Sequence, residues 1–251
     1  MSLPAYSEQQ LLEPEGNTPR TENDHVPDDF KWSDVVAECA IDIRHAFIRK
    51  VYLILTSQIL LTALISGLIM FNRDVHNFAL ANGWMMVVSL IGSIVFMLLA
   101  MWKQKSYPWN LVYLAGFTLF EAYLVGNLSA VYDTKVVIQA GAITVVVFMG
   151  LTVFAMQTRW DFTGIAPYLC AGLFALIGFG FISMFIRSSG LEMAYSIVAV
   201  IIFSGFILVD TQNIMARYDP ESEVAAAIAL YLDVINLFVN ILRILNSADD
   251  N

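Results

Sequence analysis

Apolar residues in this chain form long uninterrupted runs, separated by short polar segments. Each run is about 20 residues long, which is what an α-helix needs to cross the hydrocarbon core of a bilayer. The apolar–polar alternation typical of membrane β-barrel strands is absent. The pattern therefore predicts seven transmembrane helices, at Val51–Phe71, Trp84–Trp102, Trp109–Val131, Val136–Met156, Ile165–Ile186, Met193–Met215 and Val224–Leu245.

The segments outside these runs have a different character. Residues 1–30 are rich in Pro, Glu, Asp, Asn and Thr and cannot bury enough apolar surface to offset the entropy of ordering, so we expect a disordered acidic tail. Residues 31–50 carry apolar side chains at helical spacing and predict an amphipathic helix at the membrane interface. A seven-helix domain at 51–246 and a short tail at 247–251 complete the predicted organisation. Because no basic segment precedes an apolar core at the start, we expect no cleavable signal peptide.

Composition supports this assignment. Hydrophobic residues make up 58% of the chain and charged residues 14%, whereas soluble domains are about 45–50% apolar and about 25% charged. We therefore expect an all-α membrane protein, a seven-transmembrane-helix bundle, whose immediate partner is the lipid bilayer. The net charge of −9 disfavours nucleic acid as a partner and favours cations. The two cysteines, Cys39 and Cys170, do not suggest a disulfide framework.

Basic residues near the ends of the spans predict the orientation, because they accumulate on the cytosolic side. A cytosolic N-terminus places seven of them in the cytosol and four on the other side. The cytosolic group is Arg44, Arg49, Lys50, Lys103, Lys105, Arg159 and Arg217, and the other group is Arg73, Lys135, Arg187 and Arg243. The N-terminus and the link between the last two spans are thus predicted to be cytosolic.

Each of the last two spans contains one aspartate, Asp210 and Asp233. The short polar link at 217–223 forces the two spans into a hairpin, and at about 1.5 Å per residue both carboxylates would lie roughly 10–15 Å from the turn. Acidic residues inside a span are costly and usually functional. Two of them at matched depth predict a functional site.

Two interpretations of this pair are open. In the structural one, neighbouring polar side chains cap each acid and hold the helices together; the candidates are Thr211, Gln212, Asn213 and Asn236. In the functional one, both carboxylates cannot easily ionise in a medium of low dielectric. They would then titrate as a unit near neutral pH with a shared proton, acting as a pH sensor and gate on an ion path.

Glu121, in the middle of the third span, should face the bundle interior or a water-filled cavity. Asn236 and Asn240, one turn apart in the last span, are secondary candidates for lining the same path. For these asparagines, as for Asn127, interhelical hydrogen bonds are the favoured interpretation.

Asp219, Glu221 and Glu223 make the link between the last two spans acidic. A solvated turn accounts for such a cluster. If the aspartates gate a path, the cluster would also concentrate divalent cations at its cytosolic mouth.

The sequence lacks the residues that several kinds of catalysis require. None of the three histidines, His25, His45 and His76, lies in a span, so a membrane zinc hydrolase has no ligands. Neither a glycine-rich phosphate loop nor a Gly-x-Ser-x-Gly elbow occurs. We expect no enzyme, no bound metal site and no cofactor.

Four segments resemble the transmembrane Bax-inhibitor-motif family, in particular its Lifeguard branch. The resemblance covers roughly Ala46 to Leu245, and its most specific part is the last segment. The segments are FIRKVYLILTSQ at 47–58, YPWN at 107–110 with FTLFEA at 117–122, VDTQ at 209–212, and YLDVINLF at 231–238.

The resemblance implies a seven-helix fold with the last helix at its centre. It also implies a pH-sensitive Ca²⁺ leak in an internal membrane (endoplasmic reticulum, Golgi, vacuole or endosome) that opposes apoptotic or stress-induced death. Two aspartates form the pH-sensing latch of that family and correspond to Asp210 and Asp233. Some relatives pair the first with an arginine at the end of span two, where this chain has Lys103 and Lys105, and lysine is a poorer bidentate partner.

Two rival functions belong to other classes. Paired intramembrane aspartates also define presenilin-like proteases, in which one acts as base and one as acid. The sequences around Asp210 and Asp233 lack the Tyr-Asp and Gly-x-Gly-Asp settings of that class. The other rival is a scaffold that binds death-regulatory membrane proteins and conducts no ion.

Overall fold

The computed structural model describes residues 41–183, 185 and 189–249, and these residues form helices joined by short connections, with no strand among them. Seven of the helices are long and apolar enough to cross a membrane, so the predicted fold class is confirmed. The helices are α2 (Ile41–Phe71), α3 (Arg73–Ala81), α4 (Trp84–Trp102), α5 (Trp109–Ala130), α6 (Thr134–Gln157), α7 (Ala166–Ser183), α8 (Ser189–Ala216) and α9 (Glu223–Asp249), and a 3₁₀ turn at Thr163–Ile165 precedes α7.

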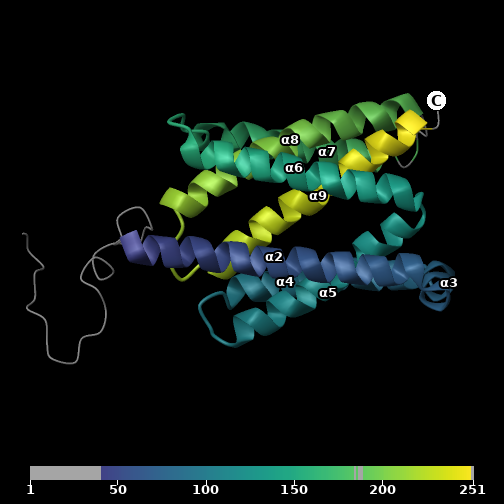
Figure 1. Cartoon of the computed structure of the whole chain (residues 1–251), viewed down its shortest axis with the longest axis horizontal. Coiled ribbons are helices and arrows are strands. Elements are labelled where there is room, and N and C mark those ends of the chain that lie inside the picture. The colour runs from purple at the N-terminus through teal and green to yellow at the C-terminus, as the bar shows by residue number, and fades with distance from the viewer. Residues whose placement is uncertain (1–40, 184, 186–188, 250–251) are drawn as a thin grey trace, which may run out of the picture.

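The seven long helices run back and forth along the length of the molecule (Figure 1). One end of the bundle, here called the N-terminal face, holds the start of α2, the α4–α5 and α6–α7 connections and the α8–α9 link. The other end, the opposite face, holds α3, the α5–α6 turn and the end of α9. An α-helix satisfies most of its backbone hydrogen bonds internally, which a hydrocarbon environment demands.

The last helix, α9, lies at the centre of the bundle. In its most apolar stretch 61% of the residues are buried, whereas no other spanning helix exceeds 39%. It packs against α2, α6 and α8, and Leu230, Tyr231 and Leu237 are fully buried. The outward faces of the other helices carry exposed side chains such as Leu64 and Phe174, as expected for surfaces that contact lipid. The central place implied for the last helix is thus confirmed.

The structure differs from the sequence prediction at three places. Residues 41–50 are not a separate helix but the first turns of α2, because neither Gly nor Pro occurs between Ile41 and Ser66. The short helix α3, capped by the Asn72 side chain, was not predicted. At the C-terminus, α9 continues to Asp249 and so extends into the tail predicted at 247–251. The predictions for residues 1–40 lie outside the described residues.

Candidate functional site

Asp210 of α8 and Asp233 of α9 face each other across the interface between their helices. Their carboxyl groups lie within hydrogen-bonding reach of each other. Asp233 is only 6% exposed and Asp210 is half-buried. Because an ionised carboxylate only accepts hydrogen bonds, a bond between the two would require a proton on one of them. The α8–α9 hairpin thus places two acids close together in the bundle.

Most neighbouring polar side chains do not cap this pair. Of the four candidates, which all lie in the described part of the chain, only Asn213 reaches it, with its Nδ2 at 3.5 Å from Asp210 Oδ1, the outer limit of a hydrogen bond. Asn236 donates instead to the carbonyl of Leu232 in its own helix. Asp233 Oδ2 is buried and accepts no hydrogen bond from a donor among the described residues. The structural interpretation therefore leaves this buried oxygen without a partner.

Gln212 has a different role from the one expected. Its Oε1 accepts a hydrogen bond from the backbone N–H of Phe162, and its Nε2 donates to the carbonyl of Trp160, both at 2.7 Å. The side chain therefore ties α8, two residues beyond Asp210, to the α6–α7 connection. Sequence reasoning missed this contact because no local signal marks a bond between residues 50 positions apart.

Tyr218 is a second residue that the sequence did not reveal. It follows α8, and its backbone N–H donates to the carbonyl of Asn213 at 3.0 Å. Burial, together with the nearby carboxylates of Asp210 and Asp233, raises the pKa of Tyr218 to about 12. The phenol therefore stays protonated at physiological pH and places a neutral hydroxyl group near the two aspartates.

Three hydroxyl side chains extend the polar region toward α2 and α6. The hydroxyl group of Tyr52 lies close to those of Thr211 and Thr152, although the three oxygens form no hydrogen bond of ordinary geometry. Thr211 is adjacent to Asp210 and is 1% exposed. Such a cluster, buried and incompletely bonded, is a suitable environment for a water molecule.

Glu121 of α5 belongs to a separate polar network. Its contacts are with Ser93 of α4 and, more distantly, with Tyr231 of α9, rather than with the aspartates. The Tyr231 hydroxyl in turn bonds that of Thr62 at 2.8 Å. The structure therefore places Glu121 toward the bundle interior but does not bring it to the aspartate pair.

The asparagines do not form the interhelical hydrogen bonds favoured from the sequence. Asn127, Asn236 and Asn240 each donate from Nδ2 to the carbonyl four residues earlier in the same helix. This bond is available to an asparagine inside a helix without any partner. The Oδ1 atom of Asn240 stays buried and without a donor among the described residues. Asn236 and Asn240 follow Asp233 on one side of α9, at helical spacing.

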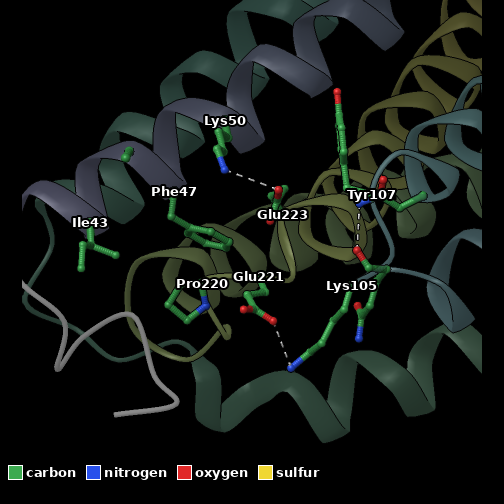
Figure 2. A pocket seen from close by; sticks show the side chains of 11 residues that line it. Ile43, Phe47, Lys50, Lys105, Tyr107, Pro220, Glu221 and Glu223 are labelled. Carbon is green, nitrogen blue, oxygen red and sulfur yellow. Dashed lines mark hydrogen bonds and ion pairs between the residues drawn. The ribbon is translucent and has the colours of Figure 1, made fainter. Parts of the chain in front are cut away.

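The acidic link is held by lysines at the N-terminal face. Lys105 Nζ lies 2.6 Å from Asp219 Oδ2 and 3.8 Å from Glu221 Oε2, and Lys50 Nζ lies 3.7 Å from Glu223 Oε1. Figure 2 shows Lys50, Lys105, Glu221 and Glu223 around a pocket of about 380 Å³ between the start of α2, the α4–α5 connection and the link. The three acids are therefore each paired with a lysine, on a link that stays partly exposed to solvent.

Neither lysine at the end of α4 contacts Asp210. Lys103 Nζ lies over the ring of Trp102, 4.9 Å from its centroid, and Lys105 reaches the link instead. Within the described residues, no Lys or Arg side chain forms an ion pair with either aspartate. In the part of the chain that the structure describes, no cationic side chain therefore lies against the pair to balance a negative charge on it.

Lys105→Met is expected to loosen the link with little effect on global stability. Burial raises the pKa of Asp219, but the hydrogen bonds from Lys105 and from the Glu221 backbone outweigh it and hold the pKa below its usual value. The ion pair between Lys105 and Asp219 is therefore present at neutral pH and is lost as the pH falls through that lowered pKa. An exposed pair of this kind contributes less than about 1 kcal/mol to the free energy of unfolding.

Limited trypsin digestion after Arg217 measures this loosening, because cleavage reports the population of the open link. Lys105→Met should be cut severalfold faster than the wild type at pH 7. This is the change expected if the closed form of the link loses up to about 1 kcal/mol of stability. Lys103→Met, which removes a neighbouring lysine that does not contact the link, serves as the control. Equal digestion rates for the two variants would show that the Lys105 contacts do not hold the link.

Comparisons with known proteins agree with the resemblance seen in the sequence. The sequence model of the family described as "Inhibitor of apoptosis-promoting Bax1" matches residues 44–250. "Bax inhibitor 1" of Schizosaccharomyces pombe is 37% identical over 99% of this chain and 91% of its own length. "Protein lifeguard 4" of Mus musculus is 37% identical over 89% of this chain and 94% of its own. The "Golgi anti-apoptotic protein" of Vaccinia virus is 34% identical over 88% and 93%, respectively.

Proposed function

Because this chain belongs to the family of inhibitors of apoptosis-promoting Bax1, we propose that it opposes cell death as a pH-sensitive Ca²⁺ leak in an internal membrane. The anti-apoptotic names of its relatives support the first part of the proposal, and the name of the viral relative supports a membrane such as that of the Golgi. Asp210 and Asp233 are the gate and the proton sensor. In this proposal the N-terminal face is cytosolic.

One observation carries the mechanism: two carboxyl groups meet inside an apolar bundle, and no Lys or Arg among the described residues neutralises them. Buried charges require a partner, and the remaining candidates are protons and mobile cations. A proton shared by the pair joins α8 to α9. Loss of the proton leaves two repelling charges that favour separation of the helices and attract a cation.

Flux through the purified protein tests this proposal directly. Proteoliposomes loaded with Ca²⁺ should release it in the presence of the protein, at a rate that changes between pH 5.5 and 8, and protein-free liposomes should not. Flux independent of pH would remove the sensor role from the pair. The absence of any flux at every pH would favour the scaffold function, in which the protein acts by binding death-regulatory membrane proteins.

The orientation can be checked by cysteine labelling in a variant whose native cysteines are replaced by serine. Ala216, beside the link, and Ala248, near the end of α9, are both exposed. Ala216→Cys should react with an impermeant thiol reagent added from the cytosol, and Ala248→Cys only after the membrane is permeabilised. Reaction of both positions from the same side would contradict the crossing of α9, and the reverse pattern would contradict the cytosolic N-terminus.

A further inference from the structure

A second cavity lies inside the membrane-spanning region, away from the aspartates. Its volume is about 330 Å³, and it lies between α2 and α6, with residues of α5 and α9 completing its wall. In Figure 1, α9 crosses between α2 and α6, and these two helices each pack on α9 but scarcely on each other. We call this cavity the lateral groove.

The groove is open to the surrounding bilayer. Phe71 of α2 and Ile138 and Val145 of α6 line it and are more than half exposed, whereas Val234 and Ile235 of α9 line it from the buried core. Its wall is almost entirely apolar. Because the protein spans a membrane at this level, the medium that reaches the groove from the side is lipid.

Two serine hydroxyl groups in the wall have no partner. Ser66 of α2 and Ser129 of α5 both line the groove, and the Oγ atom of each is buried without a hydrogen bond among the described residues. Other hydroxyl groups in the same wall are satisfied: Thr144 donates to the carbonyl of Ala140, and Thr62 bonds Tyr231. Buried polar groups in proteins nearly always have a partner, so the two serines indicate an acceptor supplied from outside the chain.

The polar and apolar parts of the groove lie at different depths. Ser129 is one residue from the end of α5, and Ser66 lies about 8 Å from the end of α2 at about 1.5 Å per residue. Both hydroxyl groups are therefore near the opposite face. Val234 and Ile235 lie about 17 Å along α9 from its start, close to the middle of a hydrocarbon core about 30 Å thick.

We propose that the lateral groove binds one acyl chain of a glycerolipid from the leaflet at the opposite face. The ester carbonyl accepts hydrogen bonds from the hydroxyl groups of Ser66 and Ser129, and the chain extends along Val234 and Ile235. An ester at the boundary of the hydrocarbon core and an apolar chain below it match the two parts of the groove. This inference concerns the helices α2, α5, α6 and α9 and does not depend on whether the aspartate pair conducts Ca²⁺.

Gly141 offers a way to fill the groove without disturbing the protein. It lines the groove, and a Cβ atom at its position meets no described atom within 4 Å, so Gly141→Leu should occupy the space meant for the acyl chain. Gly150 lies nine residues further along α6, on the other side of the helix, and a Cβ there also meets no described atom. Gly150→Leu is the matched control.

The probe is phosphatidylcholine with a photoactivatable diazirine in one acyl chain, in nanodiscs containing the full-length protein. In the wild type and in Gly150→Leu, crosslinks should map to peptides containing Val234–Phe238 and Val137–Val145. In Gly141→Leu these crosslinks should fall about tenfold, as expected when binding to the filled site is lost. Equal crosslinking in Gly141→Leu and Gly150→Leu would overturn the proposal.

The serines provide an independent test should Gly141→Leu fail to fold. A double variant, Ser66→Ala with Ser129→Ala, should retain about tenfold less phosphatidylcholine per protein after detergent exchange, because two hydrogen bonds are lost. Unchanged retention would show that the hydroxyl groups hold no ester, for instance because they bind water. Crosslinking by a diazirine fatty acid but not by the phospholipid would overturn the assignment to a glycerolipid.

Discussion

Replacing Asp233 with asparagine is expected to flatten the pH dependence of Ca²⁺ release and to weaken the release itself. The variant keeps the shape of the side chain but removes one of the two groups between which a proton is shared. Asp233 is also the more deeply buried of the pair, on the central helix. Asp210→Asn should flatten the pH curve as well but alter mainly the balance between closed and open states, because Asp210 lies near the end of α8 that joins the link.

The measurement is Ca²⁺ flux from proteoliposomes between pH 5.5 and 8. In both variants the ratio of the Ca²⁺ release rates at pH 5.5 and pH 8 should fall to about one. A gate needs only a few kcal/mol of difference between its open and closed states to change their populations, and in the wild type the shared proton supplies that difference. Asp74→Asn is the control, because it neutralises an aspartate of the short helix α3 at the opposite face, away from the link. If both pair variants keep the wild-type pH curve, the aspartates are a structural contact.

Gly126→Leu is expected to cause the largest loss of stability. A Cβ at Gly126 would lie 2.6 Å from Ile69 Cδ1 and 3.2 Å from Ser66 Cα. The second contact is with backbone, so a larger side chain must push α5 away from α2. Overpacking of this kind costs about 1–3 kcal/mol and sometimes more, and here we expect the upper end of that range.

Thermal unfolding of the detergent-solubilised protein measures this cost. Gly150→Leu introduces the same side chain where nothing described lies within 4 Å, and it should change the free energy of unfolding by no more than about 0.5 kcal/mol. If the two variants unfold at the same temperature, α2 and α5 do not approach each other as closely as the structure shows.

The sequence was sufficient to predict the spanning helices because each is encoded by its own apolar run. Asp210 and Asp233 could be paired in advance for a similar reason: a short link between two spans leaves only a hairpin. The partner of Gln212 and the position of Tyr218 could not be predicted, since both depend on how α8 packs against the α6–α7 connection. The asparagine hydrogen bonds were predicted wrongly because a local bond to the preceding turn competes with any interhelical one.

The continuity of α2 has a mechanical consequence. At about 1.5 Å per residue its 31 residues measure about 46 Å, whereas the hydrocarbon core is about 30 Å thick. The excess length extends beyond the hydrocarbon core at the N-terminal face as the first turns of α2. There Lys50 forms an ion pair with Glu223, the first residue of α9. A protein that binds residues 41–50 would hold an arm about 15 Å long, continuous with about 31 Å of the same helix inside the bilayer. A force on that arm would reach the central helix through the packing of α2 on α9.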